Sequence, residues 1–345
     1  MKAVLARGAS HVKIAVYWPS FMPSLKFFMA LPMPRPRPGR RFAPKMITMI
    51  ARMISSSGTP MLPMTWLLNA LIVPLFAASA LASQFASGVN LTEVYATVVD
   101  DAGAPVAGLT AADFRVSEDG RPQAISVFAA GEFPLSVVVA LDRSFSMAGA
   151  KLDLAKRAAA AFIRALRQED EVSVIAIGSE IETITPAVPA RVAAATAWDA
   201  ISAWGSTPLY DATRRSIDVI QTRKGRRALL IVSDGVDRDS ETSAASLIDY
   251  ARRSDVQVYP VAIGKERVSE LAELAGVTGG RSIAVRDPKQ LEAALASLAR
   301  ELRMQYLLGY VPARPVNSHA GWHAIEVQTA RPGVHVRARE GYFAK

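Results

Sequence analysis

The sequence contains no cysteine, so no disulfide bond, thiolate metal site or cysteine nucleophile can form. Lipid attachment through an N-terminal cysteine is excluded for the same reason. The fold must therefore be held together by its hydrophobic core, and the 263 residues after Ala82 are enough to build one. Histidine is scarce as well, with four residues in all: His11, His319, His323 and His335.

Acidic residues are absent from the first 82 positions. Residues 1–52 carry ten lysines and arginines, and residues 53–82 carry no charge. The formal net charge of +9 originates in this segment, because the 30 basic and 31 acidic residues beyond Ala82 nearly cancel. The remainder of the chain thus gives no reason to expect nucleic-acid binding. The length of the basic segment leaves open a later start of translation, at Met46, Met53 or Met61.

Residues 66–81 form an apolar run that ends in the small-x-small tripeptide Ala80-Leu81-Ala82. A basic stretch followed by such a run and tripeptide is typical of a secretory signal peptide, here cleaved after Ala82. Residues 1–82 are therefore predicted to be a leader, and the protein to be periplasmic or extracellular. An uncleaved membrane anchor is the alternative, because about 17 apolar residues is the short limit for a span. No second run of 18 apolar residues follows.

Oxygen-bearing side chains follow two apolar runs at the point where each run ends. Residues 135–141, LSVVVAL, and 228–232, ALLIV, are short and rich in β-branched residues, as expected of strands buried on both faces of a parallel sheet. Asp142 follows the first run and Asp234 follows the second. Ligands of open α/β sheets bind outside the carboxyl ends of the strands, so both aspartates are expected at the functional edge.

Three hydroxyl side chains accompany these aspartates. Ser144 and Ser146 lie just beyond Asp142 in the segment DRSFS, and Thr207 lies in GSTPLYDA, where Pro208 opens a predicted helix. Two carboxylates and three hydroxyls form an all-oxygen ligand set, which suits a hard dication such as Mg²⁺. The sequence therefore predicts a metal site from Asp142, Ser144, Ser146, Thr207 and Asp234.

Strands and helices alternate between residues 135 and 305, which predicts an α/β fold with a doubly wound, mostly parallel sheet. Helices are expected at 151–166, 192–204, 209–222, 244–253, 266–275 and 288–304. Strands are expected at 171–177, 182–186, 256–263 and 282–285, besides the two apolar runs. Residues 90–131 predict a small β module with a hairpin around Asp119-Gly120. Residues 306–345 predict three short strands that pack with this module.

The order D-x-S-x-S, then a threonine loop, then an aspartate loop resembles the von Willebrand factor type A domain and its metal-ion-dependent adhesion site. Residues 90–345 as a whole are similar to the secreted "VWFA-related" proteins of Acidobacteria, on the segments DAGAPVAGLTAADF, QYLLGY and RAREGYF. The resemblance implies that the hydroxyls of Ser144, Ser146 and Thr207 touch Mg²⁺, with Mn²⁺ or Ca²⁺ as alternatives. It also implies that Asp142 and Asp234 act partly through water. An Asp or Glu of a partner protein would complete the coordination.

Other interpretations remain open at this point. DRSFS is also typical of a helix-capping turn, and SDG of an ordinary strand exit. Asp237 and Asp239 do not extend the site into a calcium loop, because Asp239 occupies the sixth position from Asp234, where glycine is required. We expect a binding domain and no enzyme, since no histidine or glutamate stands beside a ligand and no phosphate-binding glycine motif follows a strand. A metal-dependent hydrolase or a purely structural metal site is the alternative.

Overall fold

The computed structural model describes residues 91–131, 133–196, 198–264, 269–313 and 321–344, together with three strands nearer the N-terminus. These strands, β1 (Lys2–Arg7), β2 (His11–Tyr17) and β3 (Phe27–Pro32), pair in antiparallel order within a separate unit, residues 1–86. The predicted apolar run at 66–81 and the predicted cleavage site after Ala82 lie outside the described residues. Among the residues described, no helix is long and apolar enough to cross a membrane.

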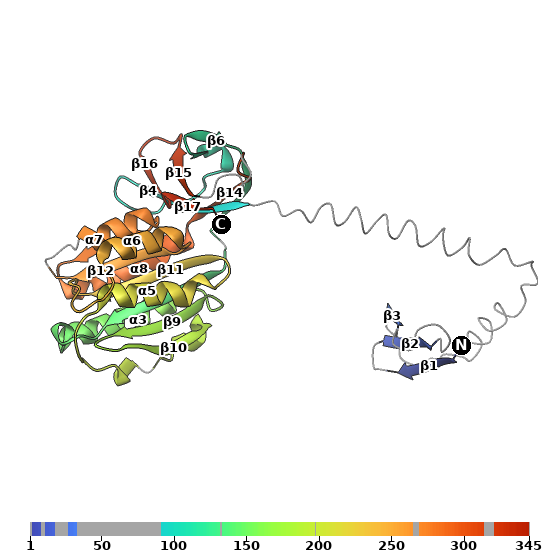
Figure 1. Cartoon of the computed structure of the whole chain (residues 1–345), viewed down its shortest axis with the longest axis horizontal. Helices are drawn as coiled ribbons and strands as arrows, with labels where there is room; N and C mark the ends of the chain where they lie inside the picture. Colours follow the sequence, from blue (N-terminus) through green and yellow to red (C-terminus); the bar gives the residue numbers. More distant parts are fainter. Residues whose placement is uncertain are drawn as a thin grey trace, which may run out of the picture. The chain divides into compact units, whose positions relative to one another are not determined.

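A six-stranded sheet in the order β10-β9-β8-β11-β12-β13 forms the centre of the second unit (Figure 1). Its strands are β8 (Leu135–Asp142), β9 (Glu171–Ile177), β10 (Ile181–Pro189), β11 (Arg226–Ser233), β12 (Gln257–Ile263) and β13 (Ile283–Val285). All pairs are parallel except β9 with β10. All eight residues of β8 are buried, as expected of a strand covered on both faces. The predicted doubly wound fold class is confirmed.

Helices cover both faces of this sheet because successive residues of β8 point to opposite sides. Val137 and Val139 pack in one core with α3 (Ala150–Ala165) and α8 (Leu291–Arg303). Val138 and Ala140 pack in a second core with α5 (Leu209–Gln221), α6 (Ala244–Arg253) and α7 (Ser269–Val277). The helices predicted at these places are present, with ends shifted by a few residues.

The helix predicted over 192–204 is wrong. Of the residues described in this segment, only α4 (Ala190–Ala193) and a 3-10 turn, Trp198–Ala200, are helical. The alanine-rich periodicity favours a helix locally, but one local side-chain hydrogen bond and one long-range backbone hydrogen bond determine the path of the chain. The Thr196 hydroxyl donates to Ala193 O at 2.6 Å, and the Trp204 N–H donates to Arg143 O at 2.7 Å, next to the predicted metal site.

The two flanks of the α/β domain together form a β module. One sheet, β16-β4-β14-β7, contains β4 (Thr92–Asp100), β7 (Ile125–Ala130), β14 (Tyr306–Tyr310) and β16 (Val334–Arg337). The other, β17-β15-β5-β6, contains β5 (Phe114–Glu118), β6 (Arg121–Gln123), β15 (Trp322–Thr329) and β17 (Gly341–Phe343). The parts of residues 306–344 that the structure describes thus provide four strands rather than the three expected, because turns divide the segment after β15 into two very short strands.

The two sheets of the β module share one hydrophobic core. Val94 of β4, Phe114 of β5 and Tyr306 of β14 are all buried in it, and the rings of Phe114 and Tyr306 lie 5.2 Å apart. Strand β14 follows α8 directly and pairs with both β4 and β7, so the end of the α/β domain enters the centre of this sheet. Neither flank could bury its apolar residues alone.

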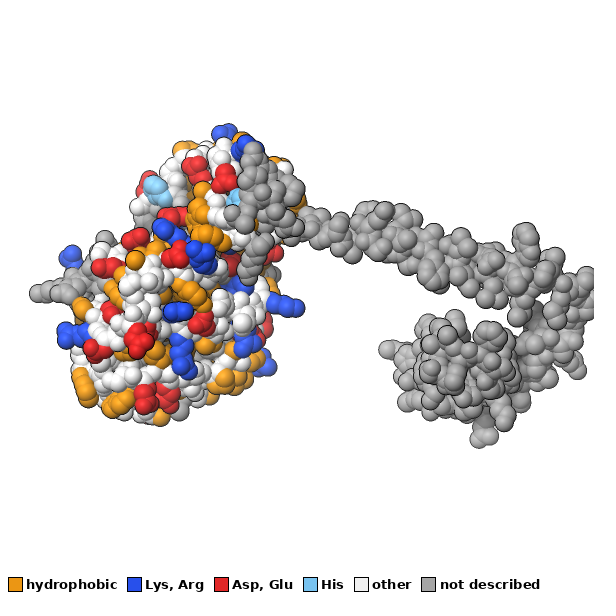
Figure 2. Space-filling view, in the orientation of Figure 1, with side chains coloured by type: hydrophobic (Ala, Val, Ile, Leu, Met, Phe, Trp, Pro, Cys, Tyr) orange, Lys and Arg blue, Asp and Glu red, His pale blue; other side chains and the backbone are white. Residues whose placement is uncertain are grey.

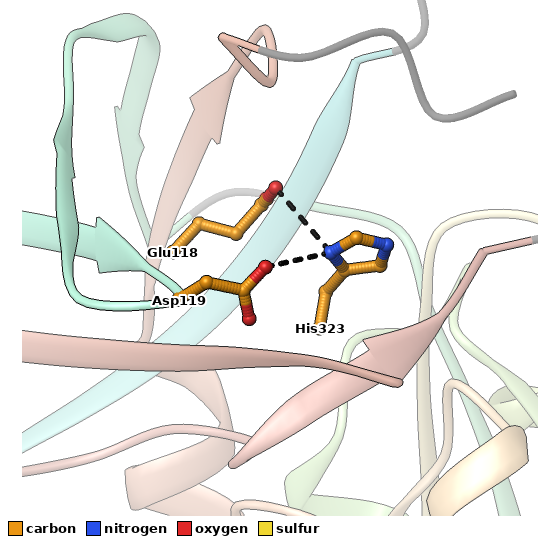
Figure 3. A group of neighbouring side chains, drawn as sticks. All are labelled: Glu118, Asp119 and His323. Carbon is orange, nitrogen blue, oxygen red and sulfur yellow. Dashed lines mark hydrogen bonds and ion pairs between the residues drawn. The ribbon is translucent and has the colours of Figure 1, made fainter. Parts of the chain in front are cut away.

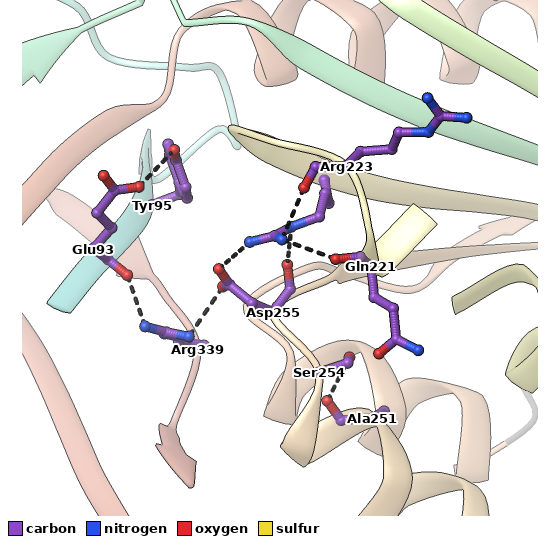
Figure 4. A network of polar contacts seen from close by, with 9 residues as sticks. Glu93, Tyr95, Gln221, Arg223, Ala251, Ser254, Asp255 and Arg339 are labelled. Carbon is purple, nitrogen blue, oxygen red and sulfur yellow. Dashed lines mark hydrogen bonds and ion pairs between the residues drawn. The ribbon is translucent and has the colours of Figure 1, made fainter. Parts of the chain in front are cut away.

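Polar contacts attach the β module to the α/β domain (Figure 4). The Arg339 guanidinium forms an ion pair with Asp255 at 3.0 Å and donates to Glu93 O at 2.7 Å. Asp255 is also paired with Arg227 of β11. Deeper in the junction, the buried Arg226 donates to Gln305 Oε1 at 3.2 Å. These contacts hold the module beside the edge of the sheet where β11 and β12 begin.

Candidate metal centre

Strands β8 and β11 place the predicted site at one edge of the sheet. The two strands are parallel neighbours in a register that pairs Leu141 with Val232, so Asp142 and Ser233 end them side by side. Asp142 is fully buried. Its Oδ1 accepts a hydrogen bond from the Ser144 N–H at 2.8 Å, and its Oδ2 accepts one from the Ser233 hydroxyl at 2.6 Å. The carboxylate therefore holds the loop that carries both predicted serine ligands.

Ser146 lies within hydrogen-bonding distance of both Ser144 and Asp234. Ser144 Oγ and Ser146 Oγ are 3.1 Å apart, and the Ser146 hydroxyl donates to Asp234 Oδ1 at 2.9 Å. Four of the five predicted residues are thus linked in one chain of polar contacts, although Ser146 and Asp234 are 88 positions apart in the sequence.

Backbone hydrogen bonds bring the threonine loop to the same place. The Phe145 N–H donates to Gly205 O at 3.1 Å, and the Arg238 N–H donates to Thr207 O at 2.8 Å. Thr207, which is buried, therefore lies between the serine loop and the aspartate loop. Gly205 has a φ of 79°, and a Cβ there would approach the Ser179 backbone nitrogen to 2.6 Å, so the close approach of the loop requires glycine.

The donor set fits a hard divalent cation. Ligands about 2.1 Å from an octahedral Mg²⁺ lie about 3.0 Å from each other at neighbouring positions. The Ser144–Ser146 and Ser146–Asp234 separations of 3.1 and 2.9 Å match this spacing. Burial raises the pKa of Asp142, and the negative charge of Asp234 raises it further. A cation between the two carboxylates would oppose both effects, whereas nothing in the set attracts a soft metal.

Lys151 also contacts this edge, and sequence reasoning missed it. Its ammonium, from the first turn of α3, lies 2.8 Å from Asp234 Oδ2 and 2.8 Å from Ser146 O. Ser233 was missed as well. Ser233 directly precedes Asp234 in the sequence, and this adjacency is the signal that could have found it, whereas no sequence signal points to Lys151, five positions after Ser146.

Replacing Lys151 by methionine is expected to raise the affinity for Mg²⁺ about tenfold. The substitution removes a positive charge that competes for Asp234, and a change of 1.4 kcal/mol corresponds to a factor of ten. Titration calorimetry on metal-free protein measures the change. Lys156→Met, which alters a lysine one turn further along α3 that pairs with Asp153, is the control and should leave the affinity unchanged. An unchanged affinity in Lys151→Met would show that the ammonium does not compete with the metal.

Asp237 and Asp239 support the loops and do not enter the chain of predicted ligands. Asp237 Oδ1 accepts hydrogen bonds from the Tyr210 N–H at 2.9 Å and the Ser240 hydroxyl at 2.6 Å. Asp239 accepts one from the Ser206 hydroxyl. Both carboxylates therefore fasten the start of α5 and the threonine loop to the segment after β11.

Comparison with known proteins places this site within a described domain type. Residues 137–236, which include all five predicted ligands, match the family model of the von Willebrand factor type A domain. No match was found among curated proteins.

Several solved structures are similar to this chain. A von Willebrand factor type A protein from Catenulispora acidiphila is 18% identical with a TM-score of 0.45, over 68% of this chain and 63% of the other, so this chain spans less than two thirds of that relative. An aerotolerance-related membrane protein from Bacteroides fragilis is 19% identical, over 48% and 99% of the chains, with a TM-score of 0.41. The proximal thread matrix protein 1 from the mussel byssus, in a structure with zinc in its metal-ion-dependent adhesion site motif, is 14% identical, over 52% and 48%, with a TM-score of 0.44.

Proposed function

Because residues 137–236 of this chain form a von Willebrand factor type A domain, we propose that the protein is an exported binding protein that recognises a partner protein through a divalent cation. The cation would be Mg²⁺, with Mn²⁺ or Ca²⁺ as alternatives, held by Asp142, Ser144, Ser146, Thr207 and Asp234. The observation that carries the proposal is the all-oxygen chain from Ser144 through Ser146 to Asp234.

The five proposed ligands would leave one coordination position of the cation for a further anionic ligand. When bound, the cation supplies a positive charge with a coordination position that accepts an external oxygen. The three hydroxyls are neutral, so only Asp142 and Asp234 offset the charge of the ion. Ser233 and the Ser144 N–H already occupy the oxygens of Asp142, which limits how much of its charge is available. A carboxylate from an Asp or Glu of the partner suits the remaining position.

Three large apolar side chains close in sequence to the predicted ligands are exposed, and we call them the apolar rim: Phe145, Trp204 and Val236. They are 66%, 42% and 43% exposed, and each lies within three positions of a predicted ligand. Trp204 lies over the guanidinium of Arg143 at 5.8 Å, which keeps the indole in place. Exposed aromatic residues close to a polar anchor are typical of protein interfaces. The apolar rim therefore supports a protein partner whose carboxylate is flanked by apolar side chains.

The distribution of charged side chains does not support nucleic-acid binding as the main role. The hydrogen bonds of two nearby carboxylates do not support catalysis either. On the face seen in Figure 2, basic and acidic side chains are interspersed, and the chain beyond Ala82 is close to neutral. Asp237 and Asp239, which follow the predicted ligand Asp234 in the sequence, accept hydrogen bonds that fasten the loops. A general base needs a carboxylate or imidazole free to take a proton, so these two residues favour binding over hydrolysis.

Export is proposed on the basis of the leader. Cleavage after Ala82 would leave the β module intact, because its first strand, β4, begins at Thr92. The membrane would be involved only if the leader remained uncleaved as an anchor.

Crosslinked pull-down from envelope extracts tests the proposal. We expect the purified mature protein to capture a partner in Mg²⁺, and to lose it after chelation and in the variant Asp142→Ala. Phe145→Ser is expected to keep the metal and to weaken capture about tenfold, because burial of a phenylalanine side chain contributes about 1.5–3 kcal/mol. Val192→Ser, which alters a side chain that is 51% exposed on α4, is the matched control.

Two results would contradict the proposal. Capture that persists both after chelation and in Asp142→Ala would eliminate metal-dependent adhesion. Metal-dependent turnover of a model ester or phosphate by the purified protein, lost in Asp142→Ala, would replace binding by hydrolysis as the function of this site.

A further inference from the structure

A second group of metal-ligating side chains lies in the β module. Glu118 ends β5, Asp119 begins the turn to β6, and His323 lies on β15 (Figure 3). His323 Nδ1 is 2.9 Å from Asp119 Oδ2 and 3.9 Å from Glu118 Oε1. Within the part of the chain that the structure describes, this is the one group of His, Asp and Glu residues that brings three ligand atoms within 4.8 Å of one another.

Neighbouring groups orient the two carboxylates toward the imidazole. The other oxygen of Glu118, Oε2, accepts hydrogen bonds from the hydroxyls of Tyr310 at 2.5 Å and Tyr342 at 3.2 Å. The other oxygen of Asp119, Oδ1, accepts one from the Ala324 N–H at 2.9 Å. Glu118 Oε1 and Asp119 Oδ2 are therefore the oxygens directed at His323. Outer partners that fix first ligands in this way are a general feature of metal sites.

The electrostatics of the group favour a dication. The Glu118 side chain is 8% exposed and that of His323 is 13% exposed, so two carboxylates share one partly buried imidazole. One imidazolium can balance one carboxylate only. A dication bound through neutral imidazole would balance both.

We propose that Glu118, Asp119 and His323 bind a borderline dication of the Zn²⁺ class. Imidazole nitrogen with carboxylate oxygens suits Zn²⁺ better than Mg²⁺ or Ca²⁺. Ligands about 2.1 Å from a tetrahedral Zn²⁺ lie about 3.4 Å apart, so the observed separations of 2.9 and 3.9 Å require shifts of about half an ångström. The site differs in chemistry from the all-oxygen centre at the sheet edge, and the proposal does not rest on the function proposed for that centre.

The ion would join the two flanks of the chain. His323 and Asp119 are 204 positions apart, and β5 pairs with β15 in a register that places Glu118 opposite Ile325. A metal here would cross-link the N-terminal strands to the C-terminal strands in a protein that has no disulfide to do so. Because binding to the folded state alone stabilises that state, zinc would stabilise the β module.

Zinc titration of metal-free Asp142→Ala protein tests the proposal, because this background removes the sheet-edge centre as a competing site. We expect one zinc equivalent by calorimetry and X-ray absorption that shows nitrogen and oxygen ligands. Zinc a hundredfold above its Kd should raise the Tm by about 5–10 °C. Added to the same background, His323→Asn should abolish this binding and Asp119→Asn should weaken it at least tenfold.

The variants are chosen so that loss of folding does not imitate loss of the site. Asparagine at position 119 keeps an oxygen for the Ala324 N–H and tolerates the φ of 48° found there. His335 is the matched control, since its Nε2 lies 3.0 Å from Asp101 Oδ1 in the same module but outside any three-ligand group among the described residues. His335→Asn should therefore change neither zinc stoichiometry nor the Tm shift.

Two outcomes would overturn the proposal. If Asp142→Ala protein binds no zinc equivalent, the group is an ordinary ion pair. If zinc binds with an affinity that neither Asp119→Asn nor His323→Asn changes, the ion lies elsewhere. Partner capture that persists after chelation and in Asp142→Ala would contradict the proposed function, whereas zinc binding by the same variant would leave this proposal standing, so the two proposals fail separately.

Discussion

Asp142→Ala is expected to weaken Mg²⁺ binding by about a hundredfold, measured by titration calorimetry on metal-free protein. The side chain is fully buried and its two oxygens hold the Ser144 N–H and the Ser233 hydroxyl. Its removal therefore eliminates one of two carboxylates and also releases the loop that carries two hydroxyl ligands. Asp142→Asn keeps the shape of the side chain, so comparison of the two variants separates loss of charge from loss of loop position.

Asp237→Asn is the matched control for this experiment. It removes one negative charge near the same edge, while the asparagine oxygen can still accept from the Tyr210 N–H and the Ser240 hydroxyl. We expect its Mg²⁺ affinity to stay within about twofold of the unmodified protein. An equal loss in Asp237→Asn would attribute the effect to the overall charge of the edge. Wild-type affinity in Asp142→Ala would exclude that residue from the metal site.

The convergence of the predicted site could be read from the sequence because it depends on a simple rule. Parallel strands end at one edge of a sheet, so polar residues directly after β8 and β11 must come together. The β-branched apolar runs identify these strands, and Pro208 identifies the start of α5 beside Thr207. Local patterns thus specify both the strands and their direction.

The features that were missed depend on contacts between distant side chains. Lys151 belongs to an amphipathic helix, and nothing in its spacing indicates that its ammonium reaches Asp234. The helix wrongly expected over 192–204 shows the opposite case, in which a good local pattern is overridden. The bond from the Trp204 N–H to Arg143 O fixes the chain against the serine loop instead.

The β module marks a further limit of sequence reasoning. Pairing of the two flanks could be expected, since neither has enough strands to be stable alone. The register of this pairing could not be predicted from the sequence. That register determines that His323 lies beside Glu118 and Asp119. A shift of one residue would turn His323 to the other face of the sheet. The second proposed metal site is therefore a property of strand pairing, whereas the first is a property of strand ends.

The last helix is tied to both the α/β domain and the β module through one buried carboxylate. Glu301 of α8 is 3% exposed, and its two oxygens each lie 2.7 Å from a guanidinium, of Arg281 and of Arg337. Arg281 precedes β13, whereas Arg337 belongs to β16 in the module. Four residues after Glu301 the chain reaches Gln305, which donates to Thr97 of β4 at 2.8 Å. This end of α8 is therefore held by charges as well as by its apolar face.

Glu301→Ala is accordingly expected to lower the free energy of unfolding by about 3 kcal/mol, measured by urea denaturation followed through tryptophan fluorescence. Removing one partner of a buried ion pair leaves the other charge without compensation, and here two arginines that are each 27% exposed lose their partner. Glu292→Ala, at an exposed position of the same helix, should change stability by less than about 0.5 kcal/mol. Mg²⁺ affinity should be the same in both variants, because α8 contributes no predicted ligand. A loss of metal affinity in Glu301→Ala alone would instead couple this junction to the sheet-edge centre.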